Sequence, residues 1–311
     1  MDKPIIYTII LNWNGYTDTR ELLDSLKLIK TPEIEIIVVD NNSSGNDVKL
    51  LETNYIDFST ILKCDSNLGF AGGNNIGIRK ALESNPGYIL LINNDTIVEP
   101  DFLSILLAKI NTDEKIGIVA PQINYYDEPE KVWSAGGKIS RIRGSGFAVS
   151  DKLENEIAQT DRYVDFVSGC CMLIKKEVFQ NVGLFDEKFF LYTEDTDYCF
   201  RVKKAGYKIY FTPSSKIYHK VNRSTENKFS TLPLYYTTRN RLFFVKKNFN
   251  KFFPLTSSYI ILSMFLKSLI WLFMLKPKNI STVYYAIKDF FLNRMGKTEH
   301  NNFTDFTLGH K

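Results

Sequence analysis

Carboxylate and amide side chains stand directly behind apolar runs in this sequence. The run 88–92 ends in Asn93, Asn94 and Asp95, whose oxygens can hold a divalent cation against a phosphate group. The alternative is an ordinary turn, because Asn and Asp are common turn formers. Two earlier apolar runs end in the same way, at Asn12 and Asn14 and at Asp40 and Asn42.

A second group of acids, Glu194, Asp195 and Asp197, opens a segment whose apolar residues recur at helical spacing. Neighbouring carboxylates can act as a general base. The competing interpretation is a capping cluster at a helix N-terminus, in which Asp197 pairs with Arg201 four residues later.

The elements that must position these residues alternate between strand and helix. Strands are predicted over residues 5–11, 35–39, 60–63 and 88–92, with amphipathic helices between them. This pattern is typical of a doubly wound parallel α/β sheet. Right-handed crossovers place the carboxyl ends of all its strands on one edge, so the polar residues behind them should converge on one site.

Two further segments fit a nucleotide site. Asp40 can accept hydrogen bonds from a base or ribose, or else cap a helix. The Gly- and Asn-rich segment 65–77, which holds Asn67 and Gly72, is predicted to be a loop that lets a nucleotide approach the backbone. Neither G-x-G-x-x-G behind the first strand nor G-x-x-x-x-G-K-[ST] is present, which removes the main support for nicotinamide and P-loop sites.

Composition and charge narrow the class of protein. With 44% hydrophobic and 24% charged residues, the chain of 311 residues is globular in composition. Its four cysteines show neither C-x-x-C spacing nor a disulfide framework, which favours a reducing cytosolic environment. The N-terminus does not read as a signal peptide. Residues 241–311 carry 11 Lys and Arg against 3 Asp and Glu, a net +8, which leaves −4 for residues 1–240. Basic charge in one apolar tail indicates an anionic membrane surface and not a nucleic acid.

The motifs, taken together, resemble a known family. In chain order they are VVDNNSS (38–44), NLGFAGGNNIG (67–77), LLINNDTIVEP (90–100), SGCCMLIKKEVF (168–179), VGLFDEKFFLYTEDTDYCFRVKKAGY (182–207), IYHK (217–220) and TRNRLFF (238–244). This series resembles the inverting family-2 glycosyltransferases, and within them the rhamnosyltransferase-type enzymes of bacterial polysaccharide assembly. The resemblance implies a GT-A catalytic domain over residues 1–240, with a doubly wound mixed sheet flanked by helices.

The resemblance also implies roles for single residues. The metal motif Asp-x-Asp of the family corresponds to residues 93–95, so that Asp95 is the carboxylate ligand of Mn²⁺ or Mg²⁺ and His219 is a second ligand. Asp195 is the expected base, with Glu194 as its alternate. The other residues expected to bind the nucleotide-sugar donor are Asn12, Asn14, Asp40, Asn42, Asn67, Gly72, Asn93, Asn94, Gly169 and Arg239.

One aromatic and two basic positions have more than one interpretation. Trp133 can stack on a sugar face or belong to the core. Arg239 and Arg241 stand where the family holds a diphosphate, and Arg241 can equally lie on a solvated helix face.

The tail, residues 241–311, is expected to associate with a membrane. Residues 252–275 contain one charge, Lys267, and their length permits a membrane span. Lys267 and four serines favour helices that lie in the cytoplasmic leaflet instead. The side chains expected to enter the lipid are Ile260, Ile261, Phe265, Leu269, Trp271 and Phe273. The alternative is a helix packed on the catalytic domain or on a second copy in a homo-oligomer.

The sequence therefore predicts an inverting glycosyltransferase at the cytoplasmic face of the membrane. The enzyme is expected to move rhamnose or another hexose from a dTDP or UDP donor to a saccharide acceptor that is lipid-linked. Two alternatives stay open. One is a sugar-nucleotide nucleotidyltransferase, which favours a basic first loop where this chain has neutral residues 12–15. The other is a membrane-bound sugar-binding or scaffold protein without catalysis.

Overall fold

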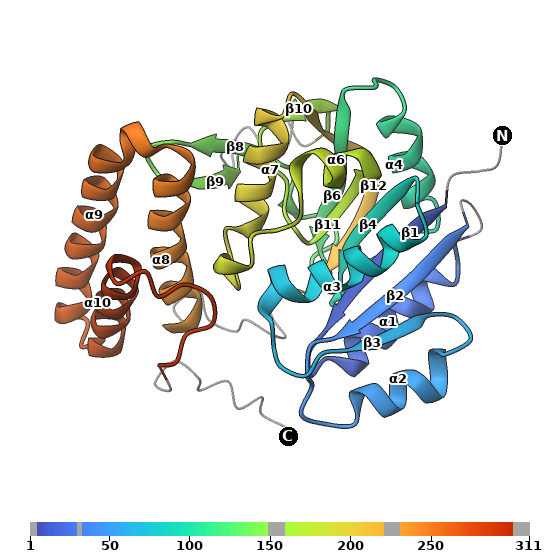
Figure 1. Cartoon of the computed structure of the whole chain (residues 1–311), viewed down its shortest axis with the longest axis horizontal. Helices are drawn as coiled ribbons and strands as arrows, with labels where there is room; N and C mark the ends of the chain where they lie inside the picture. The colour runs from blue at the N-terminus through green and yellow to red at the C-terminus, as the bar shows by residue number, and fades with distance from the viewer. Residues whose placement is uncertain (1–4, 30–32, 149–158, 221–230, 301–311) are drawn as a thin grey trace.

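One mixed sheet forms the centre of the computed structural model, which describes residues 5–29, 33–148, 159–220 and 231–300 (Figure 1). Its strand order is β10-β12-β6-β11-β4-β1-β2-β3, with β5 beside β12 and β7 beside β6. The strands are β1 (Ile6–Asn12), β2 (Ile34–Asp40), β3 (Thr60–Lys63), β4 (Tyr88–Asn93), β5 (Thr96–Val98), β6 (Ile116–Tyr125), β7 (Val132–Ser134), β10 (Arg162–Val164), β11 (Cys171–Lys175) and β12 (Lys208–His219). A separate hairpin pairs β8 (Gly137–Ser140) with β9 (Ser145–Ala148).

The sheet is parallel at one end and mixed at the other. Strands β1, β2, β3 and β4 are parallel neighbours, whereas β11 runs antiparallel to both β4 and β6. Strand β12 is again parallel to β6. The predicted strands are therefore confirmed, and so is the mixed, doubly wound sheet.

Alternate residues of the central strands enter two separate cores, because successive side chains of a strand point to opposite faces. Ile6 and Ile10 of β1 pack with α1 (Tyr16–Leu26), α2 (Asp47–Tyr55) and α4 (Phe102–Ile110). Ile9 packs on the other face, with α3 (Gly69–Glu83), α6 (Lys176–Val182) and α7 (Glu194–Lys204). Burial on both faces explains why β4 is an unbroken apolar run.

The prediction of a loop over residues 65–77 is wrong from Gly69 onward, where helix α3 begins. The glycines serve close packing of this helix on the sheet. A Cβ atom on Gly73 would lie 2.3 Å from Leu11 Cδ1, and one on Gly77 would lie 2.5 Å from Ile9 Cγ2. Gly72 is buried in the first turns of the same helix.

Three helices follow the sheet and pack on one another at one side of the molecule: α8 (Thr231–Asn248), α9 (Phe253–Phe273) and α10 (Pro277–Phe291) (Figure 1). The predicted domain boundary at residue 240 falls inside α8. Among the described residues, one helical stretch, Asn250–Phe273, is long and apolar enough to cross a membrane.

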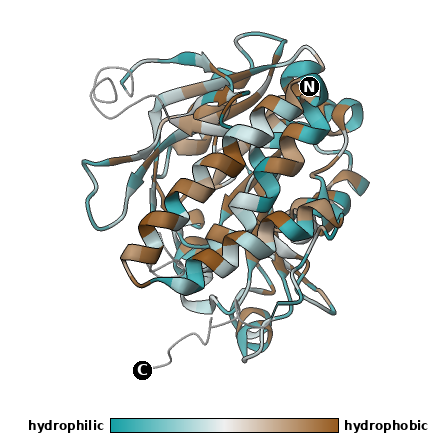
Figure 2. Ribbon diagram, turned by 90° about the vertical axis from the view of Figure 1, so that its left-hand side faces the viewer, coloured by the Kyte–Doolittle hydropathy of each residue, from teal (hydrophilic) through white to brown (hydrophobic). Residues whose placement is uncertain are grey.

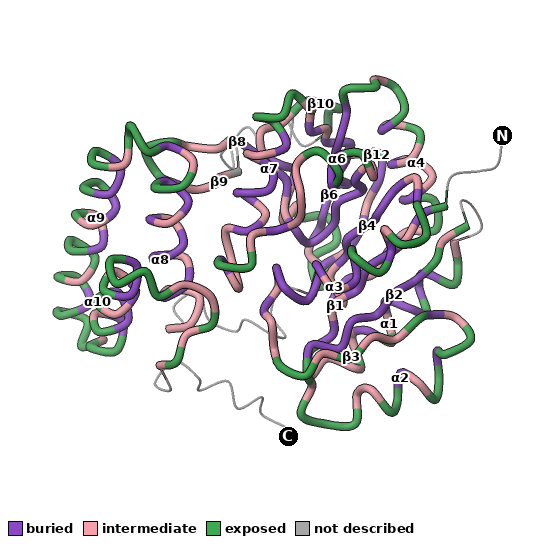
Figure 3. The backbone as a smooth tube through the Cα atoms, viewed as in Figure 1, coloured by how far each residue is buried: buried purple, intermediate pink, exposed green. Residues whose placement is uncertain are grey.

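Helix α9 uses only one side to pack on the protein. Ile260, Met264 and Trp271 are buried against α8 and α10, whereas Phe265, Leu269 and Phe273 are exposed. Figure 2 views these helices face-on, with extended apolar stretches, and Figure 3 shows exposed residues, in green, along the outer side of α9. The prediction that Ile260 and Trp271 enter lipid is therefore wrong, because the protein itself buries them.

Candidate active site

The polar residues behind the strands meet at one edge of the sheet, as predicted. Asn12 pairs with Asp40 in the β1–β2 ladder, and Leu11 pairs with Asn93 in the β1–β4 ladder. Thr96 of β5 pairs with His219 at the end of β12, so the last strand reaches the same edge.

Asp40 is the centre of a closed hydrogen-bond network. One of its oxygens accepts from Asn12 Nδ2 at 2.8 Å and from Ser43 Oγ at 2.6 Å, and the other accepts from the Ser43 N–H at 2.9 Å. Asn12 also donates to Asp47, at 3.1 Å. Asp40 does not cap α2, because that helix begins at Asp47 after Asn46. Sequence reasoning missed Ser43 and Asp47, since their role depends on contacts between two strand ends.

Two asparagines in left-handed backbone conformation shape the same edge. Asn14 has φ 51° and Asn42 has φ 64°. The Asn14 side-chain oxygen accepts a 2.7 Å hydrogen bond from the Ser44 N–H, which fixes the first loop against the second.

Asn67 meets the edge through Asn41, a residue that sequence reasoning did not select. Asn41 Nδ2 donates to Asn67 Oδ1 at 3.2 Å, and Asn41 Oδ1 accepts from the Leu68 N–H at 2.8 Å. The same Asn67 oxygen accepts from the Gly69 N–H at 2.8 Å. These contacts set the start of α3 beside the end of β2.

The residues of the turn after β4 have different partners within the protein. Asn94 Nδ2 donates to Thr19 Oγ1 at 3.0 Å, which ties the turn to α1. Asn93 donates its backbone N–H to the Cys170 carbonyl at 2.8 Å. Asp95 instead faces His219, whose Nε2 lies 3.1 Å from Asp95 Oδ1.

Asp95 and His219 fit the cation that the resemblance implies. Two adjacent ligand atoms of an octahedral Mg²⁺ or Mn²⁺ lie about 3 Å apart, close to the observed separation. Asp95 Oδ1 is buried, and apart from this imidazole no donor of the described residues reaches it. No third His, Cys, Asp or Glu of the described residues completes a metal cluster.

The surroundings of His219 hold its ring in place. The Trp133 ring packs edge-on against it with centroids 4.5 Å apart, and the half-buried Trp133 side chain also packs against the hydrophobic core. Burial opposes protonation of His219, but Cys170 and Asp95 favour it more strongly, and the pKa of His219 is raised to about 11.

Lys220 secures the end of β12. Its ammonium is buried and lies 3.0 Å from Asp18 Oδ1 and 2.5 Å from Glu21 Oε2, both on α1. Its backbone N–H donates to the Asp95 carbonyl at 2.9 Å. Sequence reasoning did not select Lys220, because its partners are about 200 residues away.

The acid run lies at the start of α7, as predicted, and its members differ in environment. Asp197 is fully buried and pairs with Arg201 at 2.8 Å and with Lys247 at 2.9 Å, so it is structural. Burial and the neighbouring Asp195 raise the pKa of Glu194 well above its ordinary value, and Glu194 Oε2 has no partner among the described residues.

Asp195 combines burial with hydrogen-bond donors. Its oxygens accept from the Gly169 N–H at 3.1 Å and from the Thr196 N–H at 2.6 Å. Burial raises the pKa of Asp195, while these donors act in the opposite direction. The carboxylate therefore has a fixed direction and a proton affinity above that of an ordinary aspartate, as a general base requires.

Residues 7–183 match the sequence profile described as glycosyl transferase family 2. The chain belongs to this family. The glycosyltransferase has curated relatives of 25–28% identity. It is 28% identical to the low-salt glycan biosynthesis hexosyltransferase Agl10 of Haloferax volcanii, over 65% of this chain and 62% of that one. It is 26% identical to the N-acetylglucosaminyl-diphospho-decaprenol L-rhamnosyltransferase of Mycobacterium tuberculosis, over 71% and 78%. It is also 26% identical to the rhamnosyltransferase WbbL of Escherichia coli, over 73% and 87%.

Solved structures support the same fold. GalNAc-T7 with UDP, GalNAc and Mn²⁺ superposes with a TM-score of 0.58 at 17% identity, over 84% of this chain and 58% of that one. The mannosyltransferase PcManGT of Pyrobaculum calidifontis, in complex with GDP-Man and Mn²⁺, gives 0.57 at 14% identity, over 92% and 74%. The implied GT-A fold is thus confirmed.

Arg239 of this glycosyltransferase is engaged inside the protein. Its guanidinium is buried and donates to the Arg294 carbonyl at 3.3 Å, the Gly296 carbonyl at 2.8 Å and the Tyr235 hydroxyl at 3.3 Å. In this conformation Arg239 ties α8 to the segment behind α10. Arg241 is half-buried, and its guanidinium donates to the Arg143 carbonyl.

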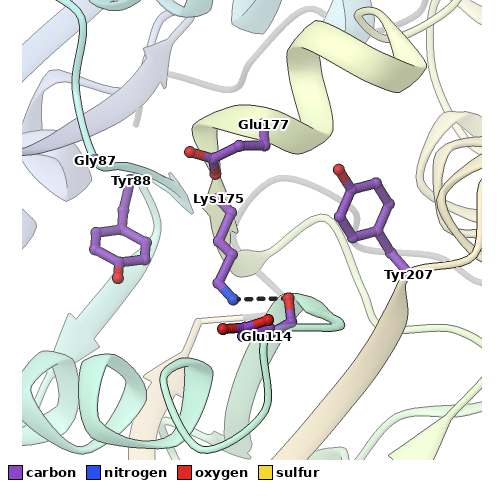
Figure 4. A pocket seen from close by; sticks show the side chains of 6 residues that line it. All are labelled: Gly87, Tyr88, Glu114, Lys175, Glu177 and Tyr207. Carbon is purple, nitrogen blue, oxygen red and sulfur yellow. Dashed lines mark hydrogen bonds between the residues drawn. The ribbon is translucent and has the colours of Figure 1, made fainter.

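A surface cavity of about 370 Å³ lies away from this site (Figure 4). It is lined by Gly87, Tyr88, Glu114, Lys175, Glu177 and Tyr207. Tyr88 opens β4 and Lys175 closes the antiparallel β11, so the cavity is at the opposite edge of the sheet from Asp95. Lys175 Nζ there donates to the Glu114 carbonyl at 3.1 Å, and the cavity plays no part in the site.

Proposed function

We propose that this family-2 enzyme transfers rhamnose or another hexose from a dTDP or UDP donor to a lipid-linked saccharide, with inversion at the anomeric carbon. One relationship carries the proposal. The Asp195 carboxylate accepts a hydrogen bond from the Gly169 N–H. The carbonyl of Cys170, the residue after Gly169, accepts from the N–H of Asn93, which stands two residues before Asp95. The proposed base and the proposed cation-binding pair, Asp95 and His219, would therefore lie on the two sides of one short segment.

The strand edge is proposed to bind the donor. Asp40, with Asn12, Asn14, Asn42 and Asn67 around it, offers acceptors and donors for the base and ribose. Asp95 and His219 would hold Mn²⁺ or Mg²⁺, which supplies positive charge to the diphosphate as the glycosidic bond breaks. Two solved neighbours bind Mn²⁺ together with a nucleotide or nucleotide sugar.

Asp195 is proposed to act as the base. It takes the proton of the acceptor hydroxyl while that oxygen forms its bond to the anomeric carbon. The bond from this carbon to the phosphate oxygen breaks in the same step, and the nucleoside diphosphate leaves with the electron pair. Attack from the side opposite to the leaving group inverts the carbon. Burial and the neighbouring Asp195 raise the pKa of Glu194, which disfavours a second charge beside the base.

The choice of sugar and acceptor rests on relatives. Rhamnosyltransferases of Mycobacterium tuberculosis and Escherichia coli and the dTDP-rhamnosyl transferase RfbF of Shigella flexneri each align with 71–78% of this chain. The printed name of the mycobacterial enzyme contains a diphospho-decaprenol acceptor. Such an acceptor presents its sugar next to a bilayer.

The outer side of α9 is proposed to bind the cytoplasmic leaflet. Exposed Leu262, Phe265, Leu266, Leu269 and Phe273 can enter the interface, while the buried side of the helix stays on the protein. A helix held in this way cannot cross a bilayer by itself, which supports insertion parallel to the membrane. The basic residues of α9 and its ends would interact with anionic headgroups: Lys251, Lys267, Lys276 and Lys278.

Release of nucleoside diphosphate tests the proposal. Purified enzyme should release dTDP from dTDP-rhamnose, or UDP from a UDP-hexose, when a polyprenyl-diphosphate saccharide and Mn²⁺ are added. Asp95→Asn should abolish this release, and Asp57→Asn, at an exposed position away from the site, should not change it. If no nucleotide sugar is consumed in the presence of any such acceptor, the proposed function is wrong.

A further inference from the structure

The loop that leads into the acid run has an unusual backbone. It joins the short helix η1 (Glu187–Phe189) to α7. Phe190, Tyr192 and Thr193 have φ of 61°, 65° and 77°, in the left-handed region that side chains with a Cβ atom disfavour. Such a backbone persists only where surrounding contacts determine it.

Asn240 of α8 supplies these contacts on one side of the loop. Its Nδ2 donates to the carbonyls of Phe189 at 2.7 Å, Leu191 at 2.9 Å and Tyr192 at 2.8 Å. The side chain is completely buried. One amide group therefore gathers three carbonyls of the loop directly before Glu194.

Arg239 sets the direction of this amide. Its Nε–H donates to Asn240 Oδ1 at 3.1 Å, so the oxygen faces the guanidinium and the NH₂ group must face the loop. An amide turned the other way would bring its oxygen against the three carbonyls. The Arg239 guanidinium is itself held by the Arg294 and Gly296 carbonyls, so the direction is fixed by a chain of hydrogen bonds.

Helix α3 holds the opposite side of the loop. The Phe70 N–H donates to the Phe190 carbonyl at 2.7 Å. Gly69, with φ 72°, leaves room for this carbonyl, because a Cβ atom there would lie 2.2 Å from the Phe190 oxygen. The loop is thus clamped between the start of α3, at the donor edge, and the middle of α8.

We propose that Asn240 is a positioning residue for catalysis: its amide holds the left-handed loop 189–193 and thereby sets where α7 begins and where the Asp195 carboxylate points. The inference deepens the proposed function and depends on it for the role of Asp195. Asn240 lies in the segment TRNRLFF (238–244), but its side chain hydrogen-bonds to the loop and to Arg239 and not to the residues of the donor edge. Its effect should therefore appear in turnover and not in donor binding.

The experiment compares Asn240→Ala with Asn248→Ala. Asn248 lies on the same helix and donates one 2.8 Å hydrogen bond to Asp197 of α7, so its loss is a matched control that leaves the loop untouched. We expect Asn240→Ala to lower kcat by roughly tenfold or more, since small misplacements of a catalytic group have effects of this size. Its Kd for dTDP or UDP with Mn²⁺ should stay within about twofold of wild type. Asn248→Ala should retain kcat.

Hydrogen–deuterium exchange gives a readout that does not depend on activity. Peptides covering residues 189–197 should exchange faster in Asn240→Ala than in wild type or Asn248→Ala, while peptides from β1 and β4 stay unchanged. Faster exchange in Asn240→Ala alone would show that Asn240 holds the loop, even if wild-type enzyme consumes none of the tested donors. Failure to consume any donor would refute only the proposed function. Unchanged kcat with unchanged exchange overturns the inference, as does an equal loss of kcat in Asn248→Ala. If Asn240→Ala does not fold, Asn240→Ser is the substitute, because its hydroxyl retains one hydrogen-bond donor. We expect its kcat to be lower and its loop exchange faster than in wild type, and wild-type values of both would overturn the inference.

Discussion

The backbone N–H of Gly169 donates to Oδ2 of Asp195 over 3.1 Å, although the two residues are 26 positions apart in the chain. Gly169 has little space around it, since a Cβ atom there would lie 3.1 Å from the Phe70 ring and 3.5 Å from Asp195 Cβ. The segment that borders the proposed cation-binding pair, Asp95 and His219, thus also directs the proposed base, and a change at either Gly169 or Asp195 should affect the other.

Asp195→Asn tests the base. The amide keeps the shape of the carboxylate but cannot take a proton, so kcat should fall by roughly a hundredfold or more while donor binding persists. Measurement of kcat and of donor Kd by calorimetry separates the two. A loss that appears only with Glu194→Gln would move the base to Glu194, and if neither variant loses activity, the acid run is structural.

Asp95→Ala tests the cation site. Loss of the carboxylate should abolish transfer and remove the increase in dTDP or UDP affinity that Mn²⁺ produces, because His219 alone binds a cation weakly. His219→Ala should show the same changes to a smaller degree. Nucleotide titrations with and without Mn²⁺ measure this directly. Full transfer in the presence of a chelator would show that the cation has no part in the reaction.

Glu194→Gln should stabilise the protein at neutral pH. The pKa of Glu194 is raised in the folded state by burial and by Asp195, so folding is most favourable where the group is protonated. This stability is complete below the unfolded pKa and is lost as the pH rises through the folded pKa. The variant should therefore have a higher Tm than wild type at pH 8, by roughly 2–4 °C for each 1 kcal/mol, and a similar Tm at pH 4. A Tm difference that is the same at both pH values would show that the glutamate is not protonated by folding.

Gly69→Ala and Gly206→Ala form a matched pair for the clamp. Both glycines have positive φ, 72° and 93°, so each alanine costs about 1–2 kcal/mol of backbone strain. Nothing lies within 4 Å of a Cβ atom at Gly206, whereas at Gly69 it meets the Phe190 carbonyl. Chemical unfolding should show a larger loss of stability for Gly69→Ala, and only this variant should lose kcat. Equal losses of stability and of kcat in both variants would mean that the loop can move away from the Cβ atom at residue 69 without an effect on catalysis.

The double variant Leu266→Glu and Leu269→Glu tests the membrane surface of α9. Both leucines are exposed, so the fold should tolerate the change, but binding to vesicles that contain anionic lipid should fall strongly. Leu28→Glu, at an exposed leucine of the catalytic part, is the control and should bind as wild type does. Vesicle flotation at low and high salt separates the electrostatic part of the binding, which salt weakens, from the apolar part, which salt does not weaken. If wild-type protein fails to float with vesicles, the leaflet is not its partner.

The fold could be predicted well from the sequence because its main signals are local. The unbroken apolar run of β4 and the polar residues behind β1, β2 and β4 indicated a parallel sheet with its site at one edge, and the structure has both. Residues 69–77 were predicted wrongly, because a glycine is an equally good signal for a loop and for a helix that lies close to a sheet. The difference depends on Ile9 and Leu11, which stand on another element.

The site could be predicted only in part, for the same physical reason. Asp95, His219 and Asp195 have chemistry that shows in their residue types. Ser43, Lys220 and Asn240 are residue types that are common throughout proteins, so their type alone does not single them out. What distinguishes them is the position of their hydrogen-bond partners, which lie from 3 to about 200 residues away in the chain. Ile260 and Trp271 show the same limit on the membrane side, since an apolar run does not reveal which of its faces the protein itself covers.

Helix α8 bears Asn240 near its middle and offers the surface on which α9 and α10 pack. A chimera that exchanges the apolar C-terminal helices between relatives should therefore carry α8 together with α9 and α10. A junction inside α8, behind Arg239, would take Arg239 from one parent and the Arg294 and Gly296 carbonyls that hold it from the other. A junction before α8 keeps these groups together and requires parents that match at the contact between Asn240 and the loop 189–193. The unit that can be exchanged in engineering thus begins between β12 and α8, well before the apolar sequence itself.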